Sequence, residues 1–215
     1  MNIRILLLPV VCGVLAACQS VQGERATYVG DGITVDPQIE WTHAIGPRES
    51  SIPGLGLDRL LFLTARDTTS VWTIDGLALD ELLFLTGVTA GDPLFRSSDV
   101  DKKDMIAYNA TMLPDDVMEM IAGTLGKAGS RQLRTSMLRP VRFGTVTGFR
   151  FDLAYTTQDG LEMKGMALFA QRQKKLDVIL FIAPSEYYYD QYAPTVEKIF
   201  SSVQVPDVPA TKPAA

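Results

Sequence analysis

The side chain types needed for nucleophilic catalysis are few in this chain. It has a single histidine, His43, so a Ser-His-Asp triad would have to use this residue as its base. Ser50, Ser51 and Ser185 are candidate nucleophiles, but none lies in the Gly-x-Ser-x-Gly turn that exposes a serine at a strand–helix junction. The sequence therefore favours a surface or strand-edge position for His43 over a hydrolase triad.

Metal-binding and nucleotide-binding patterns are also weak. With one histidine, a metal site would depend mainly on carboxylates, which suit calcium or magnesium. Residues 98–104 are the nearest candidate for a calcium loop, but they lack the central glycine and closing glutamate of an EF-hand and include two lysines. Gly54 and Gly56 lack the third glycine of a dinucleotide fingerprint. We therefore predict neither a metal site nor a cofactor.

The strongest chemical signal is a cysteine near the N terminus. Arg4 precedes thirteen uncharged residues, 5–17, an arrangement typical of a secretory signal peptide and too short to span a bilayer comfortably. The segment ends in Leu-Ala-Ala-Cys at positions 15–18, which resembles the lipobox of bacterial lipoproteins. This resemblance implies cleavage before Cys18 and lipidation of that residue. The alternative is an ordinary signal peptide in which Cys18 is incidental.

Lipidation of Cys18 would anchor the domain without a transmembrane helix. Gln19 is not the aspartate that usually retains such lipoproteins at the inner membrane, so the resemblance implies the periplasmic face of the outer membrane. Cys12 would leave with the signal peptide, so the mature chain would have no free thiol. Loss of Arg4 from 20 Lys and Arg, against 25 Asp and Glu, would leave a net charge of about −6. A surface of this charge is unsuited to nucleic acid and to anionic headgroups.

The composition predicts one domain with short extensions. Residues 1–17 would be the signal peptide, 18–25 the lipidated N terminus and a polar tether, 26–205 one domain, and 206–215, rich in proline and alanine, a disordered tail. A flexible tether of seven residues reaches only about 15 Å, so the domain would lie close to its membrane.

Three strands and two helices are expected in the second half. Phe149, Phe151, Leu153 and Tyr155 alternate with Arg150, Asp152 and Ala154, the period of a half-buried strand. An Asp-Gly turn at 159–160 leads to a second strand over 161–170, and 176–183 is apolar on both faces, which predicts a central strand. Helices are predicted over 114–126 and 193–203, with Pro114 and Pro194 in their first turns.

The first half contains a partial repeat. Residues 54–64 recur as 76–86 with nine of eleven positions identical, which predicts two similar strands joined through 71–74, although a helix remains open for either copy. Together these elements predict an α+β fold, an antiparallel meander packed by two main helices. The arrangement over 114–203 resembles the PsbP-like α+β fold of periplasmic and lumenal proteins that act as assembly or binding factors.

Aromatic side chains are the candidate contact residues. Four tyrosines lie within residues 186–192, between the predicted central strand and the last helix. Tyrosine and tryptophan are enriched at interfaces, so Trp72, Tyr187, Tyr188 and Tyr192 form a candidate ligand or partner surface. The alternative is that they pack in the core and under the helix.

These features predict a non-enzymatic binding or assembly module of the cell envelope. It would be held in the outer membrane through lipidated Cys18 and would contact an envelope protein. Two alternatives stay open. One is a binder of an apolar or glycan ligand with a pocket of about 300 Å³ or more. The other is an envelope hydrolase that uses a pair of carboxylates facing a cleft.

Overall fold

The structure, a computed structural model, describes residues 26–45, 69–74, 80–94, 105–127 and 129–206. Cys18, the predicted signal peptide, residues 54–64, the segment 98–104 and the C-terminal tail lie outside them. None of the helices in the described ranges is long and apolar enough to cross a membrane.

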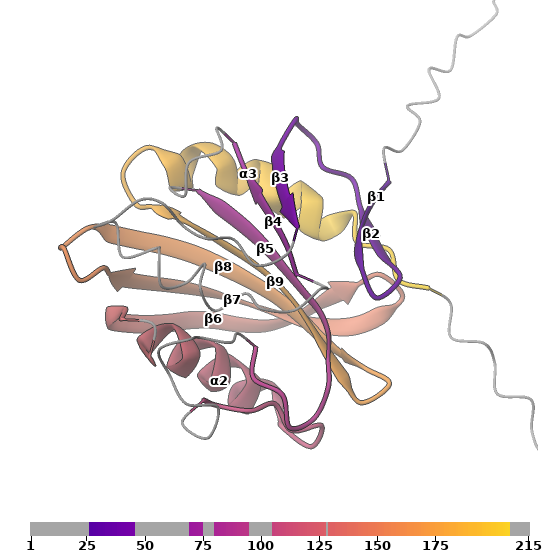
Figure 1. The fold of residues 1–215 in the computed structure, drawn as a ribbon. Helices are drawn as coiled ribbons and strands as arrows, with labels where there is room; N and C mark the ends of the chain where they lie inside the picture. Colours follow the sequence, from indigo (N-terminus) through magenta and orange to yellow (C-terminus); the bar gives the residue numbers. More distant parts are fainter. Residues whose placement is uncertain (1–25, 46–68, 75–79, 95–104, 128, 207–215) are drawn as a thin grey trace, which may run out of the picture.

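A twisted antiparallel sheet with one helix on each face forms the centre of the molecule (Figure 1). Its strands lie in the order β3-β4-β5-β9-β8-β7-β6, and every neighbouring pair is antiparallel. The strands are β3 (Thr42–Ile45), β4 (Thr69–Thr73), β5 (Glu81–Val88), β6 (Arg131–Phe143), β7 (Val146–Thr156), β8 (Glu162–Arg172) and β9 (Lys175–Pro184). A small hairpin, β1 (Thr27–Gly30) and β2 (Ile33–Val35), lies beside β4 and β5.

Each helix closes one of two apolar layers. Helix α2 (Pro114–Lys127) begins where the sequence predicts, and Asp116 accepts a hydrogen bond of 2.8 Å from the backbone N–H of Leu113. Such a bond satisfies one of the N–H groups that a helix N terminus leaves free. Helix α3 (Tyr188–Ser201) covers the opposite face with Val196, Ile199 and Phe200. The predicted α+β class, antiparallel meander and two packing helices are confirmed.

The prediction for the last helix was wrong at its start. Helix α3 begins at Tyr188, five residues before the predicted position, and Pro194 lies inside it rather than in its first turn. Proline inside a helix removes one backbone hydrogen bond. The side chains of Tyr188, Tyr189 and Tyr192 pack against the apolar layer under the helix, and this packing offsets that loss.

Two strands differ from the sequence-based prediction. Residues 71–74 were expected to connect two similar strands, but 69–73 themselves form the strand β4. The second copy of the repeat contributes most of β5, which excludes a helix there. Strand β6 was not predicted, because it carries four arginines and Pro140 at the edge of the sheet and its apolar residues do not alternate regularly. Charged residues and proline are typical of edge strands.

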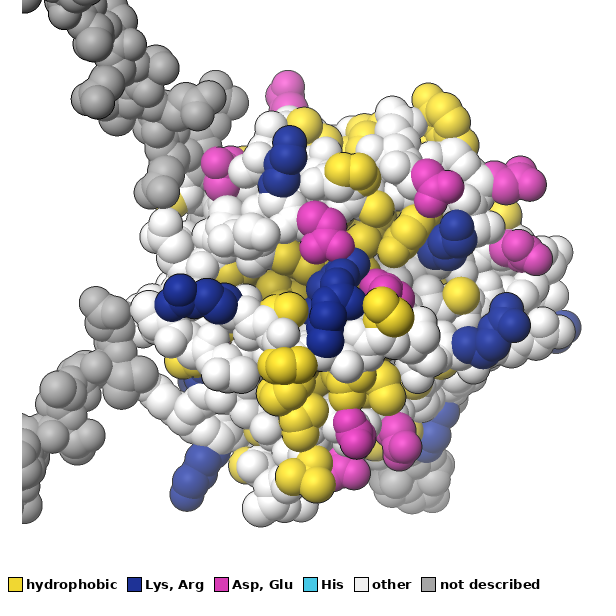
Figure 2. All heavy atoms as spheres, turned by 180° about the vertical axis from the view of Figure 1, so that it is seen from behind, with side chains coloured by type: hydrophobic (Ala, Val, Ile, Leu, Met, Phe, Trp, Pro, Cys, Tyr) yellow, Lys and Arg dark blue, Asp and Glu magenta, His cyan; other side chains and the backbone are white. Residues whose placement is uncertain are grey.

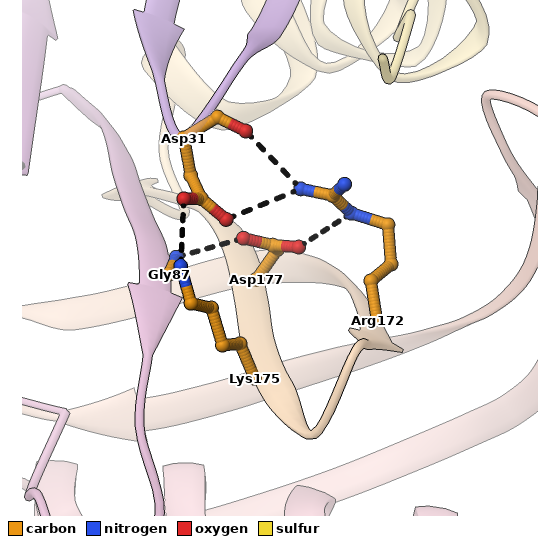
Figure 3. Close-up of polar contacts among 5 residues, drawn as sticks. All are labelled: Asp31, Gly87, Arg172, Lys175 and Asp177. Atoms are coloured by element: carbon orange, nitrogen blue, oxygen red, sulfur yellow. Dashed lines mark hydrogen bonds and ion pairs between the residues drawn. The ribbon is translucent and has the colours of Figure 1, made fainter. Parts of the chain in front are cut away.

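An ionic cluster, which we call the ionic clamp, holds the small hairpin to the sheet (Figure 3). Asp31 in the β1–β2 turn pairs with Lys175 Nζ at 3.0 Å and with Arg172 Nη2 at 3.5 Å. Arg172 Nε also donates to Asp177 at 2.8 Å, and Asp177 accepts a 2.8 Å bond from the backbone N–H of Gly87. Asp177 is completely buried, and this burial raises the pKa of its carboxyl. The clamp joins three distant segments and is structural.

Candidate functional site

Trp72 lies in the core, not on an accessible surface. Its side chain is 0% exposed, and its indole N–H donates to Ser70 Oγ at 3.0 Å. Its ring lies 4.6 Å from that of Phe84 and stacks on the imidazole of His43, also at 4.6 Å. His43 is exposed on β3, at the edge of the sheet, as expected. Trp72 therefore has no free face to offer a ligand, because the rings of His43 on β3 and Phe84 on β5 lie against it and its side chain is fully buried.

The tyrosines are divided between the surface and the helix interface. Tyr187 is 71% exposed and directly precedes α3, with a positive φ of 69°. Tyr188 meets its ring edge to face at 5.4 Å, while Tyr188 and Tyr192 are half-buried against the sheet. The structure therefore does not bring Trp72 and the three tyrosines into one exposed surface.

A groove between α3 and the β6–β7 end of the sheet is a better candidate. It has a volume of about 440 Å³, and we call it the α3 groove. Its lining consists of Val141, Arg142, Gly144, Arg150, Leu168, Glu197, Phe200, Ser201 and Val203. Figure 2 shows the face that carries α3, where basic and acidic side chains lie against one another beside a hollow with apolar side chains. The groove thus combines an apolar floor with charged groups, as ligand sites do.

Arg150 is the central charged residue of the groove. Its side chain is only 10% exposed, and its Nη2 lies 2.5 Å from Glu197 Oε1 and 3.2 Å from Asp152 Oδ1. Met166 Sδ contacts the same Nη2 at 3.7 Å. The buried Nε has no hydrogen-bond partner among the described residues. The partners that the described residues offer this guanidinium therefore gather on one nitrogen, Nη2.

The two carboxylates beside Arg150, those of Asp152 and Glu197, have raised pKa values. Burial raises the pKa of Asp152, and the charge of Arg139 opposes this shift. Burial also raises the pKa of Glu197, again opposed by Arg139, with repulsion from Asp152 adding to the rise. Tyr189 lies near them, and its burial, together with these carboxylates, raises its pKa to about 12. The arrangement favours binding over acid–base chemistry, because Arg150 lies between the carboxylates and pairs with both.

Sequence reasoning did not identify this groove. Arg150 and Asp152 were assigned to the polar face of a half-buried strand, which is correct for β7, but α3 covers part of that face. Tyr189 belongs to the tyrosine cluster that the sequence singled out, whereas Glu197 gave no local signal. Ser50 and Ser51 lie outside the described residues. Within the described ranges, no three His, Asp or Glu side chains are arranged to hold a metal ion.

The stability of the protein should depend on Glu197 as the pH falls from neutral towards 4.5, the ordinary pKa of a glutamate side chain. A carboxyl whose pKa is raised in the folded state keeps its proton where the unfolded chain has lost it. Stability therefore rises as the pH falls through the folded pKa towards the ordinary values of 3.8 for Asp152 and 4.5 for Glu197. We expect Glu197→Gln to make this rise smaller, measured by urea unfolding at pH 7 and pH 5.

Glu119→Gln on α2 is the matched control, because Glu119 is exposed and far from the groove in sequence and fold. It should leave the pH dependence as in the wild type. Asp177 contributes equally to all three proteins and so does not affect the comparison. Equal slopes for wild type and Glu197→Gln would contradict the assigned shift.

Comparison with known proteins shows which fold the chain resembles. No protein-family model matches the chain, and no curated protein matches its sequence. It is similar to cyanobacterial PsbP (CyanoP) from Synechocystis sp. PCC 6803, with a TM-score of 0.51 and 16% identity over 90% of this chain and 100% of that one. The chain has a PsbP-like fold. At this identity the likeness concerns the fold alone.

Two further structures are more distant. One is a mutant of the protein Mog1, with a TM-score of 0.43 and 11% identity over 82% of this chain and 92% of that one. The other is LpqN, involved in cell envelope biogenesis of Mycobacterium tuberculosis, with a TM-score of 0.38 and 13% identity over 86% of this chain and 88% of that one.

Proposed function

We propose that this protein is a non-enzymatic binding module of the bacterial cell envelope, held in the outer membrane through lipidated Cys18. The observation that carries the proposal is the α3 groove, whose volume of about 440 Å³ lies within the range of ligand sites. Its concave shape and the largely buried Arg150 offer a ligand or a partner a defined space and a fixed charge.

The position of the groove agrees with a short membrane anchor. Ala26, where the described chain begins, lines a smaller hollow together with Ser201 and Val203. The same Ser201 and Val203 line the α3 groove. The groove therefore lies next to the start of the domain. A tether over 19–25, with a reach of about 15 Å, would hold it close to the lipid surface.

The charges in the groove support binding over hydrolysis. A glycosidase needs one carboxylate free as a nucleophile or base and a second as an acid. Asp152 and Glu197 are instead both paired with one nitrogen of Arg150. Release of soluble fragments from isolated peptidoglycan by the wild-type chain, lost in Glu197→Gln, would favour the hydrolase instead.

Metabolic palmitate labelling tests the anchor. We expect the wild type to carry label and to fractionate with the outer membrane, and Cys18→Ala to lose the label, because Cys18 is the predicted acylation site. Cys12→Ala is the matched control. It changes the other cysteine of the chain, which would leave with the signal peptide, so the mature protein should keep its label.

In-cell crosslinking on the same samples tests the partner. A crosslinked envelope protein in the wild type, lost when Cys18→Ala releases the chain from the membrane, is the expected result. Equal labelling of wild type and Cys18→Ala, or no labelling of either, would contradict the lipoprotein assignment. Crosslinks to the chain itself alone would count against a protein partner.

A further inference from the structure

We infer that the α3 groove binds the phosphate of a phospholipid headgroup between Arg142 and Arg150. The inference deepens the proposed function and rests on its use of the groove as a binding site. The phosphate chemistry is shared by membrane lipids and small phosphate compounds. The proximity of the groove to the start of the domain favours the lipid as its source.

Arg142 supplies an available positive charge. It is exposed near the end of β6, lines the groove, and forms no ion pair with any other described residue. Two arginines, Arg142 and Arg150, line the groove, against one carboxylate, that of Glu197. The groove therefore has a local excess of positive charge, although the chain as a whole is acidic.

Arg150 supplies incompletely used donors. A guanidinium has five N–H donors, yet both carboxylates and the sulfur of Met166 contact only Nη2 of Arg150. Its Nε is buried and has no hydrogen-bond partner in the described part of the chain. An unsatisfied polar atom at this depth is uncommon in folded proteins and calls for an explanation such as an absent ion. Arg142 and Arg150 line the same groove, and arginine binds phosphate in a bidentate manner.

The rest of the groove suits a headgroup. Leu168, Phe200 and Val203 form its floor but are each at most 5% exposed, so they offer little area to an acyl chain. The glycerol backbone can lie on this floor while the acyl chains stay in the bilayer. Glu197 lines the same groove, and its charge opposes a bound anion. Removal of a positive charge from the groove and removal of the negative charge of Glu197 should therefore change phosphate binding in opposite directions.

Vesicle binding by the chain from residue 18 onward, carrying Cys18→Ala, tests the proposal, because this chain has neither the apolar segment 5–17 nor an acyl group to insert into a bilayer. We expect binding to vesicles of phosphatidylcholine, which carry phosphate without net charge, and none to vesicles of digalactosyldiacylglycerol, which lack phosphate. Arg142→Gln should weaken binding about tenfold, as loss of a charged hydrogen bond predicts. Glu197→Gln should strengthen it.

Arg134→Gln is the matched control, because Arg134 is an exposed arginine of the same strand that does not line the groove. It should bind as the parent chain does. Equal weakening by Arg134→Gln and Arg142→Gln would indicate a diffuse basic surface and overturn the proposal. No binding to either vesicle would also overturn it.

Soluble probes separate the two sources of phosphate. Titration with inorganic phosphate and with glycerol 3-phosphate, followed by NMR, should show much weaker binding than the vesicles do. The variants should keep the same order of affinity. Tight binding of inorganic phosphate without vesicle binding would assign the site to a small anion and overturn the lipid assignment. None of these assays depends on lipidation. Failure of palmitate labelling with intact vesicle binding would thus remove the anchor and leave the headgroup site.

Discussion

Replacement of Arg172 by methionine should lower the free energy of unfolding by about 3–5 kcal/mol. Arg172 is the cation that contacts Asp177, at 2.8 Å, and Asp177 is completely buried between β5 and β8 in the sheet. Removal of one partner leaves an uncompensated buried charge, which costs far more than the pair contributes. Urea unfolding followed by circular dichroism measures the effect.

Lys175→Met is the matched control within the ionic clamp. Lys175 is 38% exposed and pairs with Asp31, which is 30% exposed, so its loss should cost at most about 1 kcal/mol. The double variant Arg172→Met with Asp177→Leu should recover most of the lost stability, because no unpaired charge remains. Equal small losses for Arg172→Met and Lys175→Met would contradict the assignment of a buried clamp.

The ionic clamp also shows why the sequence alone could not predict contacts between distant residues. Asp31 and Arg172 are 141 positions apart, and no local pattern links them. The strands β7, β8 and β9 and helix α2 were predictable because their apolar residues recur with the period of the element. Periodicity indicates which face of an element is buried. It does not indicate which distant residue lies against that face.

The α3 groove illustrates the same limit. Alternation along residues 149–155 correctly places Phe151 and Leu153 in the layer under α2. Arg150 and Asp152 then point to the other face, which a sequence alone assigns to solvent. Helix α3 packs on that face and brings Glu197 to Arg150. The starting residue of α3 and the edge strand β6, both needed to form the groove, are among the features that local rules placed badly or missed.

Replacement of Trp72 by alanine should lower the free energy of unfolding by about 3–5 kcal/mol, as for other buried aromatic residues. The indole is completely buried and contacts Phe84, Trp41 and His43. Its removal leaves a cavity in the layer under α3 and leaves Ser70 without the N–H that it accepts. Thermal and urea unfolding measure the loss.

Comparison of Tyr187→Ala with Trp72→Ala distinguishes an exposed aromatic residue, which is free to make contacts, from a structural one. Tyr187 is 71% exposed, so its truncation should change stability by no more than about 0.5 kcal/mol. If both residues served one ligand surface, both variants would keep their stability and lose the same crosslinked partner. The ring of Trp72 is enclosed by neighbouring side chains, so we expect Trp72→Ala to lose much of its stability. Any loss of crosslinking in this variant would follow from unfolding. A Trp72→Ala chain as stable as the wild type would contradict this placement.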